Sequence, residues 1–469
     1  MTGVNRRQLF LSTTRGAAAT LFGAAGLSVA AHAECATAIP DSKALATRAS
    51  SGSTTRAYNV GKWMPSDQET LNQWLMKIMT KAEADTGPLL PVVDDFRSYI
   101  ETDARAYMFF TQMFDQVPES MTTSPTGLPQ VRDYQQMLRL FNVIMTHAPE
   151  FDETGLVGFP FNAILDWSMD TTGGWAGFLS GPVNAHFRRM LNEWAVFLSS
   201  PDSTFVLNDD PRSGWFGEDA KKAMPTLVED FNCDRSLPHY GFKSWDDFFT
   251  RTFREGRRPL ASPHDDSVIA NACEAAPYRI ANNVQLRENF WIKAQPYALQ
   301  FMMDNDCLAT QFVGGTIYQA FLSALSYHRW HAPVSGRVVK TRLIEGTYFS
   351  ESLAEGLDPA GPNYSQGYIS ELATRGLIFI ETDNPNIGLM AFLAIGMAEV
   401  STCDIRVYEG QRIAKGDEIG MFHFGGSTHC LIFRPEVSIS FDLHGQTPGL
   451  ESQNIPVRSS IGRVAPRKH

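Results

Sequence analysis

A turn of small residues between two apolar segments is the first feature that could support chemistry. In MFHFGGSTHCLIF, residues 421–433, two glycines precede Ser427 and Thr428. The unhindered carbonyl of Gly426 could be attacked by the hydroxyl of Ser427, a reaction that needs a base and a group that orients the base. The same residues also suit an ordinary hairpin turn, because glycine adopts positive φ at little cost and serine favours turns.

A pair of histidines supplies candidate bases for this reaction. His328 and His331 lie three positions apart in SYHRWHAPVSG, residues 326–336. Imidazole is the usual base in proteins because its ordinary pKa lies close to neutral pH. A packed or surface pair of histidines is the alternative interpretation. A metal site is disfavoured, since the sequence offers no carboxylate–histidine cluster and no Cys-x-x-Cys pair beside them.

Helical periodicity dominates the first half of the chain. Apolar residues recur at helical spacing in residues 71–79, 96–114, 134–145 and 187–198. The first of these segments follows a capping box formed by Ser66 and Glu69. We therefore expect a linker over residues 34–59 and a helical domain over residues 60–205, with the aromatic residues in its core.

The second half of the chain is typical of strands. Short apolar runs alternate with Gly, Pro and Asn in RVVKTRLIEG, GLIFIETDN and CLIFRPEVSISFDL. The segment QRIAKGDEIGMFHF, residues 411–424, resembles a hairpin between two strands. The predicted fold class is α+β, with the helical N-terminal domain followed by a β-rich catalytic domain over residues 230–469. Both candidate motifs fall in this second part, so a β framework must position them.

Composition and charge exclude several classes of protein. The 469 residues carry a formal net charge of −11, and 43% of them are hydrophobic. Nucleic-acid binding is not expected, because it needs clustered Lys and Arg. An acidic chain is also a poor match for an anionic membrane surface. Length and composition instead indicate a globular protein with a large core.

The N-terminal residues 1–33 have the features of an export signal. Arg6 and Arg7 precede an apolar stretch of small residues that ends in AHA at Ala33. Twin arginines indicate the Tat route to the periplasm, and an ordinary secretory signal is the alternative. No later apolar run reaches the length needed to span a bilayer. Because Tat cargo folds before export, we expect few disulfides among the six cysteines.

Five segments, in order over residues 240–445, resemble motifs of the phosphatidylserine decarboxylase family. YHRWHAPVSG is similar to YHR-x-H-x-P-x-x-G, and KGDEIGMFHFGGST is similar to KG-[DE]-x-x-G-x-F-x-[FM]-GGST. AIGMAEVST resembles the VGA-x-x-VG segment, and WDDFFTRTFREGRRPL resembles the FF-x-R-x-x-x-x-x-x-RP segment. FWIKAQPYAL resembles the stretch before the F-x-G-G turn, here Phe312 to Gly315. The helical half resembles, in architecture only, a branch that includes fungal tryptophan decarboxylases.

The resemblance implies a zymogen that cleaves itself between Gly426 and Ser427. Attack of the Ser427 hydroxyl converts the peptide bond into an ester, and β-elimination then releases the upstream chain. The dehydroalanine that remains hydrolyses to a covalent pyruvoyl cofactor at the start of the downstream chain. The two chains are expected to stay associated. In decarboxylation the pyruvoyl carbonyl takes up the electrons that carbon dioxide leaves behind.

The resemblance also implies roles for individual residues. His331 matches the base for self-cleavage, and His328 matches the histidine used in decarboxylation. The third member of the family triad is an aspartate in an S-P-A-D-G segment. This chain departs from that pattern, since VIANACEAAP places Glu274 at the aspartate position. Asp265 and Asp266, in SPHDD, are the alternatives for the third residue.

A small molecule that carries an amine next to a carboxylate fits this chemistry as substrate. The helical domain stands where classical members carry membrane-associating segments, so we expect a free aromatic L-amino acid. Phosphatidylserine is the alternative substrate, and membrane contact is expected only in that case. The product of the alternative reaction would be phosphatidylethanolamine.

Two further classes of protein remain open at this point. A serine-nucleophile amidohydrolase could also use Ser427 and His331, although His429 replaces the second glycine of a G-x-S-x-G elbow. A family relative that no longer cleaves could act as a binding protein. The presence of GGST together with both histidines argues against that interpretation.

Overall fold

A computed structural model describes most of the chain after residue 67. The described residues are 68–117, 131–151, 159–288, 297–323, 325–353, 364–399, 402–424 and 427–467. All of them belong to one compact unit of the chain. The expected export signal, the linker over residues 34–59 and Ser66 of the capping box lie outside the described residues, and so does Gly426.

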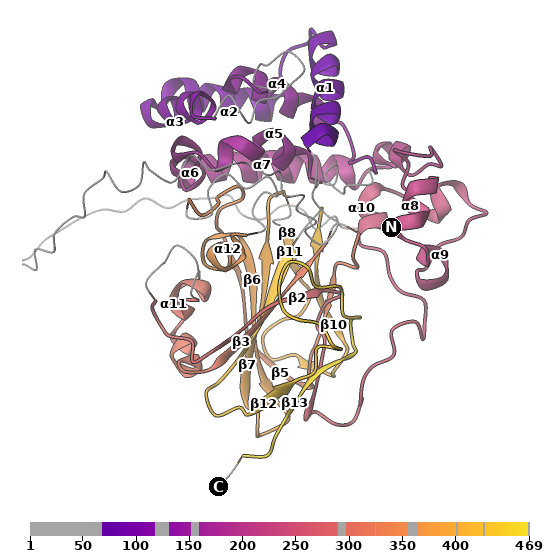
Figure 1. Ribbon diagram of the computed structural model, residues 1–469, viewed down its shortest axis with the longest axis vertical. Helices are drawn as coiled ribbons and strands as arrows, with labels where there is room; N and C mark the ends of the chain where they lie inside the picture. The colour runs from indigo at the N-terminus through magenta and orange to yellow at the C-terminus, as the bar shows by residue number, and fades with distance from the viewer. Residues whose placement is uncertain are drawn as a thin grey trace, which may run out of the picture. The chain divides into compact units, whose positions relative to one another are not determined.

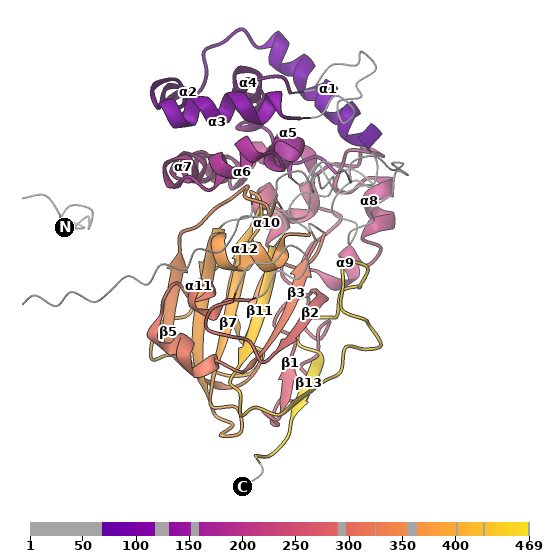
Figure 2. The same ribbon diagram turned by 60° about the vertical axis from the view of Figure 1, so that its left-hand side comes forward.

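Helices make up the first part of the described chain. They are α1 (Gln68–Ala84), α2 (Pro91–Thr102), α3 (Ala104–Asp115), α4 (Tyr134–Ile144), α5 (Pro160–Met169), α6 (Thr172–Phe178) and α7 (Gly181–Leu198). A connection of short helices follows, with η4 (Pro201–Val206), α8 (Glu218–Ala223), α9 (Leu227–Asp230), η5 (Pro238–Gly241) and α10 (Trp245–Phe249). Both ribbon views show α1 to α7 gathered beyond one end of the strands (Figures 1 and 2).

The helix boundaries follow from local chemistry. Periodicity over residues 96–114 predicts one helical segment, but the structure divides it at Asp103, whose φ of −95° and ψ of 117° are extended. The Asp103 carboxylate accepts hydrogen bonds from the backbone N–H groups of Arg105 and Ala106, so it caps the start of α3. Proline in the first turn similarly marks the starts of α2, α5 and α7.

Strands make up most of the second part. They are β1 (Val268–Ala270), β2 (Ala276–Asn282), β3 (Thr316–Leu322), β4 (Arg329–His331), β5 (Gly336–Ile344), β6 (Arg375–Thr382), β7 (Leu389–Gly396), β8 (Thr402–Ile405), β9 (Arg412–Ile413), β10 (Glu418–His423), β11 (Ser427–Phe433), β12 (Ile439–Phe441) and β13 (Ser460–Val464). Three short helices join them, α11 (Leu299–Met302), η6 (Cys307–Phe312) and α12 (Gln366–Leu372). The predicted α+β class, with helices first and a β-rich region after them, is confirmed.

The strands form one large sheet and two small ones. The large sheet has the order β2-β3-β11-β7-β6-β5-β9, and the small sheets have the orders β4-β10-β8 and β1-β13-β12. Neighbouring strands in the large sheet are antiparallel. β11 lies inside this sheet, and all seven of its residues have partners on both β3 and β7.

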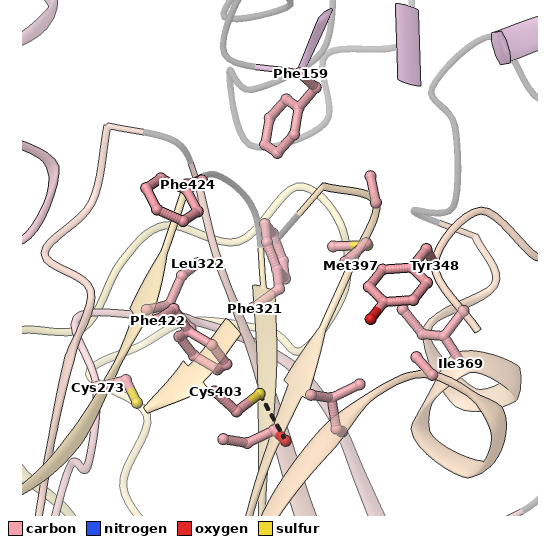
Figure 3. Close-up of a cluster of buried hydrophobic side chains, with 14 of the residues drawn as sticks. Phe159, Cys273, Phe321, Leu322, Tyr348, Ile369, Met397, Cys403, Phe422 and Phe424 are labelled. Carbon is pink, nitrogen blue, oxygen red and sulfur yellow. Dashed lines mark hydrogen bonds between the residues drawn. The ribbon is translucent and has the colours of Figure 1, made fainter. Parts of the chain in front are cut away.

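The sheet of β4, β10 and β8 packs against a face of the large sheet. Trp330 of β4 packs on Phe392 of β7 with ring centroids 5.5 Å apart. Cys403 of β8 contacts the same strand, because its Sγ lies 3.8 Å from the carbonyl oxygen of Ala394 (Figure 3). The residues between the two sheets are fully buried or nearly so, so these sheets enclose a common apolar interior.

The expected hairpin over residues 411–424 is wrong. β9 pairs with β5 at the edge of the large sheet, whereas β10 pairs with β4 and β8. The segment between them turns through Gly416, which has a φ of 87°. The two strands therefore diverge into different sheets, a choice made by long-range pairing and not by the local pattern.

Aromatic and polar contacts join the helices to the β-rich part. The ring of Phe349, in the β5–α12 connection, lies 4.8 Å from that of Phe187 and 6.2 Å from that of Phe178. Trp194 of α7 approaches Phe424, just after β10, with ring centroids 6.2 Å apart. None of the helices in the described part of the chain is long and apolar enough to cross a membrane.

An ion pair connects the end of β10 to α10. His423 Nδ1 lies 2.8 Å from Asp246 Oδ1, and His423 Nε2 lies 3.6 Å from Asp404 Oδ2 of β8. Burial by itself disfavours the charged imidazole. The hydrogen bonds and charges of the two carboxylates outweigh burial and raise the pKa of His423 to about 9.

We expect His423→Gln to destabilise the fold in a pH-dependent way. The folded pKa lies above the ordinary value, so the stabilisation is complete below about pH 6.5 and disappears as the pH rises through about 9. A pKa raised from 6.5 to about 9 corresponds to roughly 3 kcal/mol of folding free energy. In urea unfolding, the variant should be less stable than the wild type by up to that amount near pH 6. Above about pH 9.5 the difference in stability should be small.

Asp246→Asn is the matched variant for this measurement. It removes the nearer carboxylate and should reproduce much of the pH dependence, and the double variant should lose little more than His423→Gln alone. A loss of stability that does not change with pH would show that packing, and not the charge on His423, makes the contribution.

Candidate active site

Ser427 begins β11 inside the large sheet. It pairs with Leu322 of β3 and with Gly396 of β7. Its side chain is fully buried, and its Oγ has no hydrogen-bond partner within the described part of the chain. Phe424, shortly before it, has a φ of 73°, a value that bulky residues rarely adopt. A buried hydroxyl without a partner among the described residues thus lies three residues after a position with unusual backbone geometry.

The alternation of side chains along β11 shows which way Ser427 faces. Ser427 and His429 share one face of the strand. The ring of His429 stacks on Phe392 at 5.8 Å, and Phe392 in turn packs on Trp330 of β4. Ser427 therefore faces the interior between the large sheet and the sheet of β4, β10 and β8.

His328 lies on the opposite wall of that interior. Its carbonyl oxygen accepts a hydrogen bond of 2.9 Å from the N–H of Phe422, so it extends the pairing of β4 with β10. Figure 3 shows Phe422 beside Leu322, the strand partner of Ser427. The imidazole of His328 is fully buried and stacks on Phe249 of α10 with centroids 3.9 Å apart. The structure therefore brings His328 and Ser427 to one enclosed region.

The ring of His331 is held by two partners. Its Nδ1 lies 2.8 Å from the carbonyl oxygen of Gly416, and its Nε2 lies 2.8 Å from the hydroxyl of Tyr327. A carbonyl can only accept, so Nδ1 carries the hydrogen and Nε2 accepts one from Tyr327. Burial, helped by the positive charge of Arg458, lowers the pKa of His331 to about 4. The imidazole is therefore neutral at physiological pH.

The expected pairing of Glu274 with His331 is not among the described contacts. Glu274 Oε1 accepts a hydrogen bond of 2.7 Å from Arg258 Nη2, and its Oε2 accepts one of 2.8 Å from the N–H of Val457. The backbone carbonyl of Gly416 takes the position where an orienting carboxylate was expected. The positive charge of Arg258 neutralises the Glu274 carboxylate, so Glu274 has its cationic partner without His331.

Neither alternative carboxylate contacts His331. Asp265 accepts hydrogen bonds from Ser267, and its Oδ2 lies 3.0 Å from Arg463 Nη1. Asp266 accepts a hydrogen bond of 3.1 Å from the N–H of Ser335. Both carboxylates lie close to β1, and neither of them contacts His331.

Sequence reasoning missed the actual partners of His331 and Glu274. Tyr327 stands in the YHR motif itself, and Arg258 stands in the RP motif, so each is adjacent to a recognised signal. Tyr327 and Glu274 line one cavity of about 520 Å³, together with Arg251, Arg258 and Ser326 among others. The spacing of a tyrosine four residues before a histidine does not by itself predict a contact between them, and this contact is seen only in the structure.

The described residues contain no group of three or more His, Cys, Asp or Glu side chains that could hold a metal ion. Five cysteines are described, and all five are free thiols. The remaining cysteine, Cys35, lies outside the described residues.

Comparison with known proteins places the chain in a family. Two family models described as phosphatidylserine decarboxylase match residues 90–224 and 245–449. The chain is also 35% identical over 403 residues to an L-tryptophan decarboxylase of Psilocybe cubensis. This match covers 81% of the present chain and 89% of the relative. The chain belongs to the phosphatidylserine decarboxylase family. It is therefore a decarboxylase by family, and members of this family use a covalent pyruvoyl group.

Other relatives match different shares of the chain. Decarboxylase iboD of Amanita muscaria is 40% identical over 303 residues, 61% of this chain and 86% of that protein. A phosphatidylserine decarboxylase proenzyme of Clostridium perfringens is 29% identical over 239 residues, 49% of this chain and 75% of that protein. The longest of these three matches, at 403 residues, is to the tryptophan decarboxylase.

We expect Tyr327→Phe to slow self-cleavage about tenfold without loss of folding. The change removes the hydroxyl that fixes His331 Nε2, and an imidazole that is free to turn spends less time in a productive orientation. The rate is followed as the conversion of one chain into two after synthesis. His331→Ala should prevent the conversion.

Tyr318→Phe is the matched control for this variant. Tyr318 is also a fully buried tyrosine, but its hydroxyl has no hydrogen-bond partner within the described residues. The Tyr318→Phe variant should cleave itself at the wild-type rate. Equal rates for Tyr327→Phe and the wild type would show that His331 is not oriented through Tyr327.

Proposed function

We propose that the chain cleaves itself between Gly426 and Ser427 and then decarboxylates a free aromatic L-amino acid. The observation that carries the cleavage is the hydroxyl of Ser427, fully buried, without a hydrogen-bond partner among the described residues, and preceded by strained backbone at Phe424. These features fit a residue that is consumed to make a pyruvoyl group. The chain's family membership supports the same reading.

The proposed cleavage proceeds in three steps, the first of which turns the peptide bond into an ester. Ser427 Oγ bonds to the Gly426 carbonyl carbon, the peptide C–N bond breaks, and the serine nitrogen takes the proton. Loss of the Ser427 α-proton then breaks the Cβ–O bond and leaves the upstream chain with a carboxylate. Water finally replaces the nitrogen, which departs as ammonia, and a ketone remains at residue 427. A base is needed for the hydroxyl proton and again for the α-proton.

Two histidines are available as bases, by different routes. His328 faces the same interior as Ser427. His331 Nε2 already accepts from Tyr327, so a proton would reach His331 through the Tyr327 hydroxyl. We propose that His331 serves the cleavage and that His328 moves a proton in the decarboxylation. Glu274 would act at a distance, by holding Arg258 in the wall of the cavity that it shares with Tyr327.

The cofactor proposed for the mature enzyme supplies an electron-accepting carbonyl next to the substrate amine. The chain's own residues provide the surroundings for it. The interior excludes water, because Ser427, His328 and Phe422 are all fully buried. A low-polarity interior favours loss of a carboxylate as neutral carbon dioxide.

The two chains made by cleavage are proposed to stay together. The smaller chain would begin with β11, which is hydrogen-bonded to β3 on one side and to β7 on the other. Removing it would leave the large sheet without an inner strand. Export through residues 1–33 to the periplasm remains part of the proposal, and rests on the sequence pattern alone.

A free amino acid is supported as substrate by the helical part of the chain. Side chains from α5 and α7 and from their N-terminal flank cover the ends of the strands near Ser427, with Trp194 against Phe424 and the carboxylate of Glu399 bound at the start of α5. The relatives that match both parts of the chain include two proteins named L-tryptophan decarboxylase. An apolar pocket with a few polar groups is what an aromatic amino acid requires.

The purified protein should consist of two chains divided between Gly426 and Ser427. By intact mass, the smaller chain should be lighter by one ammonia than a chain that begins with serine, and it should react with phenylhydrazine. Ser427→Ala should remain a single chain. A free N-terminal serine would indicate an amidohydrolase, and an uncut wild-type chain would indicate a binding protein.

The protein should release carbon dioxide from tryptophan, phenylalanine or tyrosine in the absence of lipid and detergent. The physical reason is that a closed site takes a soluble substrate without docking to a bilayer. Manometric or isotopic measurement of carbon dioxide gives the rate, with Ser427→Ala as the blank. Activity on phosphatidylserine vesicles alone, with none on free amino acids, would assign the protein to phospholipid synthesis instead.

A further inference from the structure

A buried glutamate lies near the strand partner of Ser427. Glu399 follows Gly396 by three positions, and Gly396 pairs directly with Ser427. Because a chain extends at most about 3.6 Å per residue, the Cα atoms of Glu399 and Gly396 are within about 11 Å of each other. Only 1% of Glu399 is exposed. Glu399 therefore lies close to the end of β7 that pairs with Ser427.

The two carboxyl oxygens of Glu399 differ in their contacts. Oε1 accepts hydrogen bonds from the N–H groups of Phe161 and Asn162, at 2.5 Å and 3.0 Å, in the first turn of α5. Oε2 is buried and has no hydrogen-bond partner among the described residues. Only one of the two carboxyl oxygens of Glu399 is therefore used to cap α5. An unpartnered buried oxygen is unusual in a native protein and calls for a ligand or another explanation.

Asn162, whose backbone N–H binds Oε1 of Glu399, also has a side-chain amide with unused hydrogen-bonding groups. The residue is 1% exposed, and neither Oδ1 nor Nδ2 has a partner within the described residues. Two buried polar side chains at one junction of helix and strand thus have unused hydrogen-bonding capacity. They offer an acceptor from Glu399 and either a donor or an acceptor from Asn162.

Apolar side chains surround the junction between these polar groups and Ser427. Figure 3 shows Phe159, just before α5, extending toward the strand ends, with Phe424 on one side and Met397 on the other. All three side chains are buried. Flat apolar walls with a polar end suit an aromatic ring that carries one hydrogen-bonding atom.

We propose that Glu399 and Asn162 form the polar end of the substrate pocket and select amino acids whose aromatic ring carries an N–H donor, as indole does. The inference rests on the proposed function and specifies its substrate. The ring N–H would donate to Glu399 Oε2, while Oε1 keeps its bonds to α5. A phenyl ring would leave Oε2 unpaired, and a site built to bond a donor discriminates strongly against a ligand that lacks one.

Burial raises the pKa of the Glu399 carboxyl to about 8, against the smaller lowering effects of hydrogen bonds from the backbone N–H groups of Glu399 itself, Asn162 and Phe161. Near pH 7 the carboxyl without a ligand is therefore largely protonated. No ion pair with Glu399 occurs among the described residues, so the group has no permanent cation as partner. An N–H donor from a ligand would stabilise the ionised form and supply what the protein does not.

The test compares tryptophan with 3-(benzothiophen-3-yl)alanine, in which sulfur replaces the ring N–H at nearly the same size. The wild-type enzyme should favour tryptophan by about tenfold or more in kcat/KM. Glu399→Gln keeps an oxygen for the two amides of α5 but presents an NH₂ group in place of Oε2. In this variant the preference for tryptophan should fall to within about threefold, mostly because kcat/KM for tryptophan decreases.

Glu371→Gln is the matched control. Glu371 is also a buried glutamate, with one oxygen accepting from the N–H of Ala298, the other without a partner among the described residues, and a pKa raised by burial to about 8. It lies on α12, and the positive charge of Arg375 acts on it. The Glu371→Gln enzyme should show the same preference between the two substrates as the wild type.

The outcomes separate the inference from the proposed function. Equal turnover of the two substrates by the wild type overturns the inference while leaving an aromatic amino-acid decarboxylase, and this comparison needs no variant. An unchanged preference in a fully cleaved Glu399→Gln enzyme likewise overturns it and shows that Glu399 only caps α5. Absence of carbon dioxide from every aromatic amino acid overturns the proposed substrate class, and with it the inference.

Discussion

The antiparallel pairing of β11 between β3 and β7 is the constraint on which the rest of the structure depends. Each residue of this strand has a partner on both sides, so its first residue, Ser427, is held as firmly as its core. The strand also determines which side chains face the second sheet. A nucleophile placed here needs no further support from its own side chain, which leaves the hydroxyl available for reaction.

The site is closed by elements from three parts of the chain. The large sheet supplies Ser427, the segment that leads into β4 supplies His328, and the helices cover the strand ends. Charges near this region are kept in pairs, as in Arg258 with Glu274. The histidine with the clearest contacts, His331, is neutral because burial lowers its pKa. The interior therefore remains of low polarity, which favours decarboxylation over solvent reactions.

Local patterns in the sequence predicted much of the architecture. Helical periodicity located α4 and α7, and alternating apolar runs located β5, β6 and β11. These predictions succeed because periodicity reflects which face of a single element is buried, and that requires no knowledge of its neighbours. The motifs around His328, His331 and Ser427 likewise indicated the family, since their spacing within each segment is local.

Only the tertiary structure decided how those segments meet. The separation of β9 from β10 and the placement of Glu274 on Arg258 depend on contacts between residues that are distant in the sequence. The partner of His331 Nδ1 is a backbone carbonyl, and every residue has one, so no sequence pattern could mark Gly416 for this role. The sequence by itself predicted most of the elements, the family and Ser427 as the candidate nucleophile. Hydrogen bonds between remote strands and loops decided the environment of each reactive group.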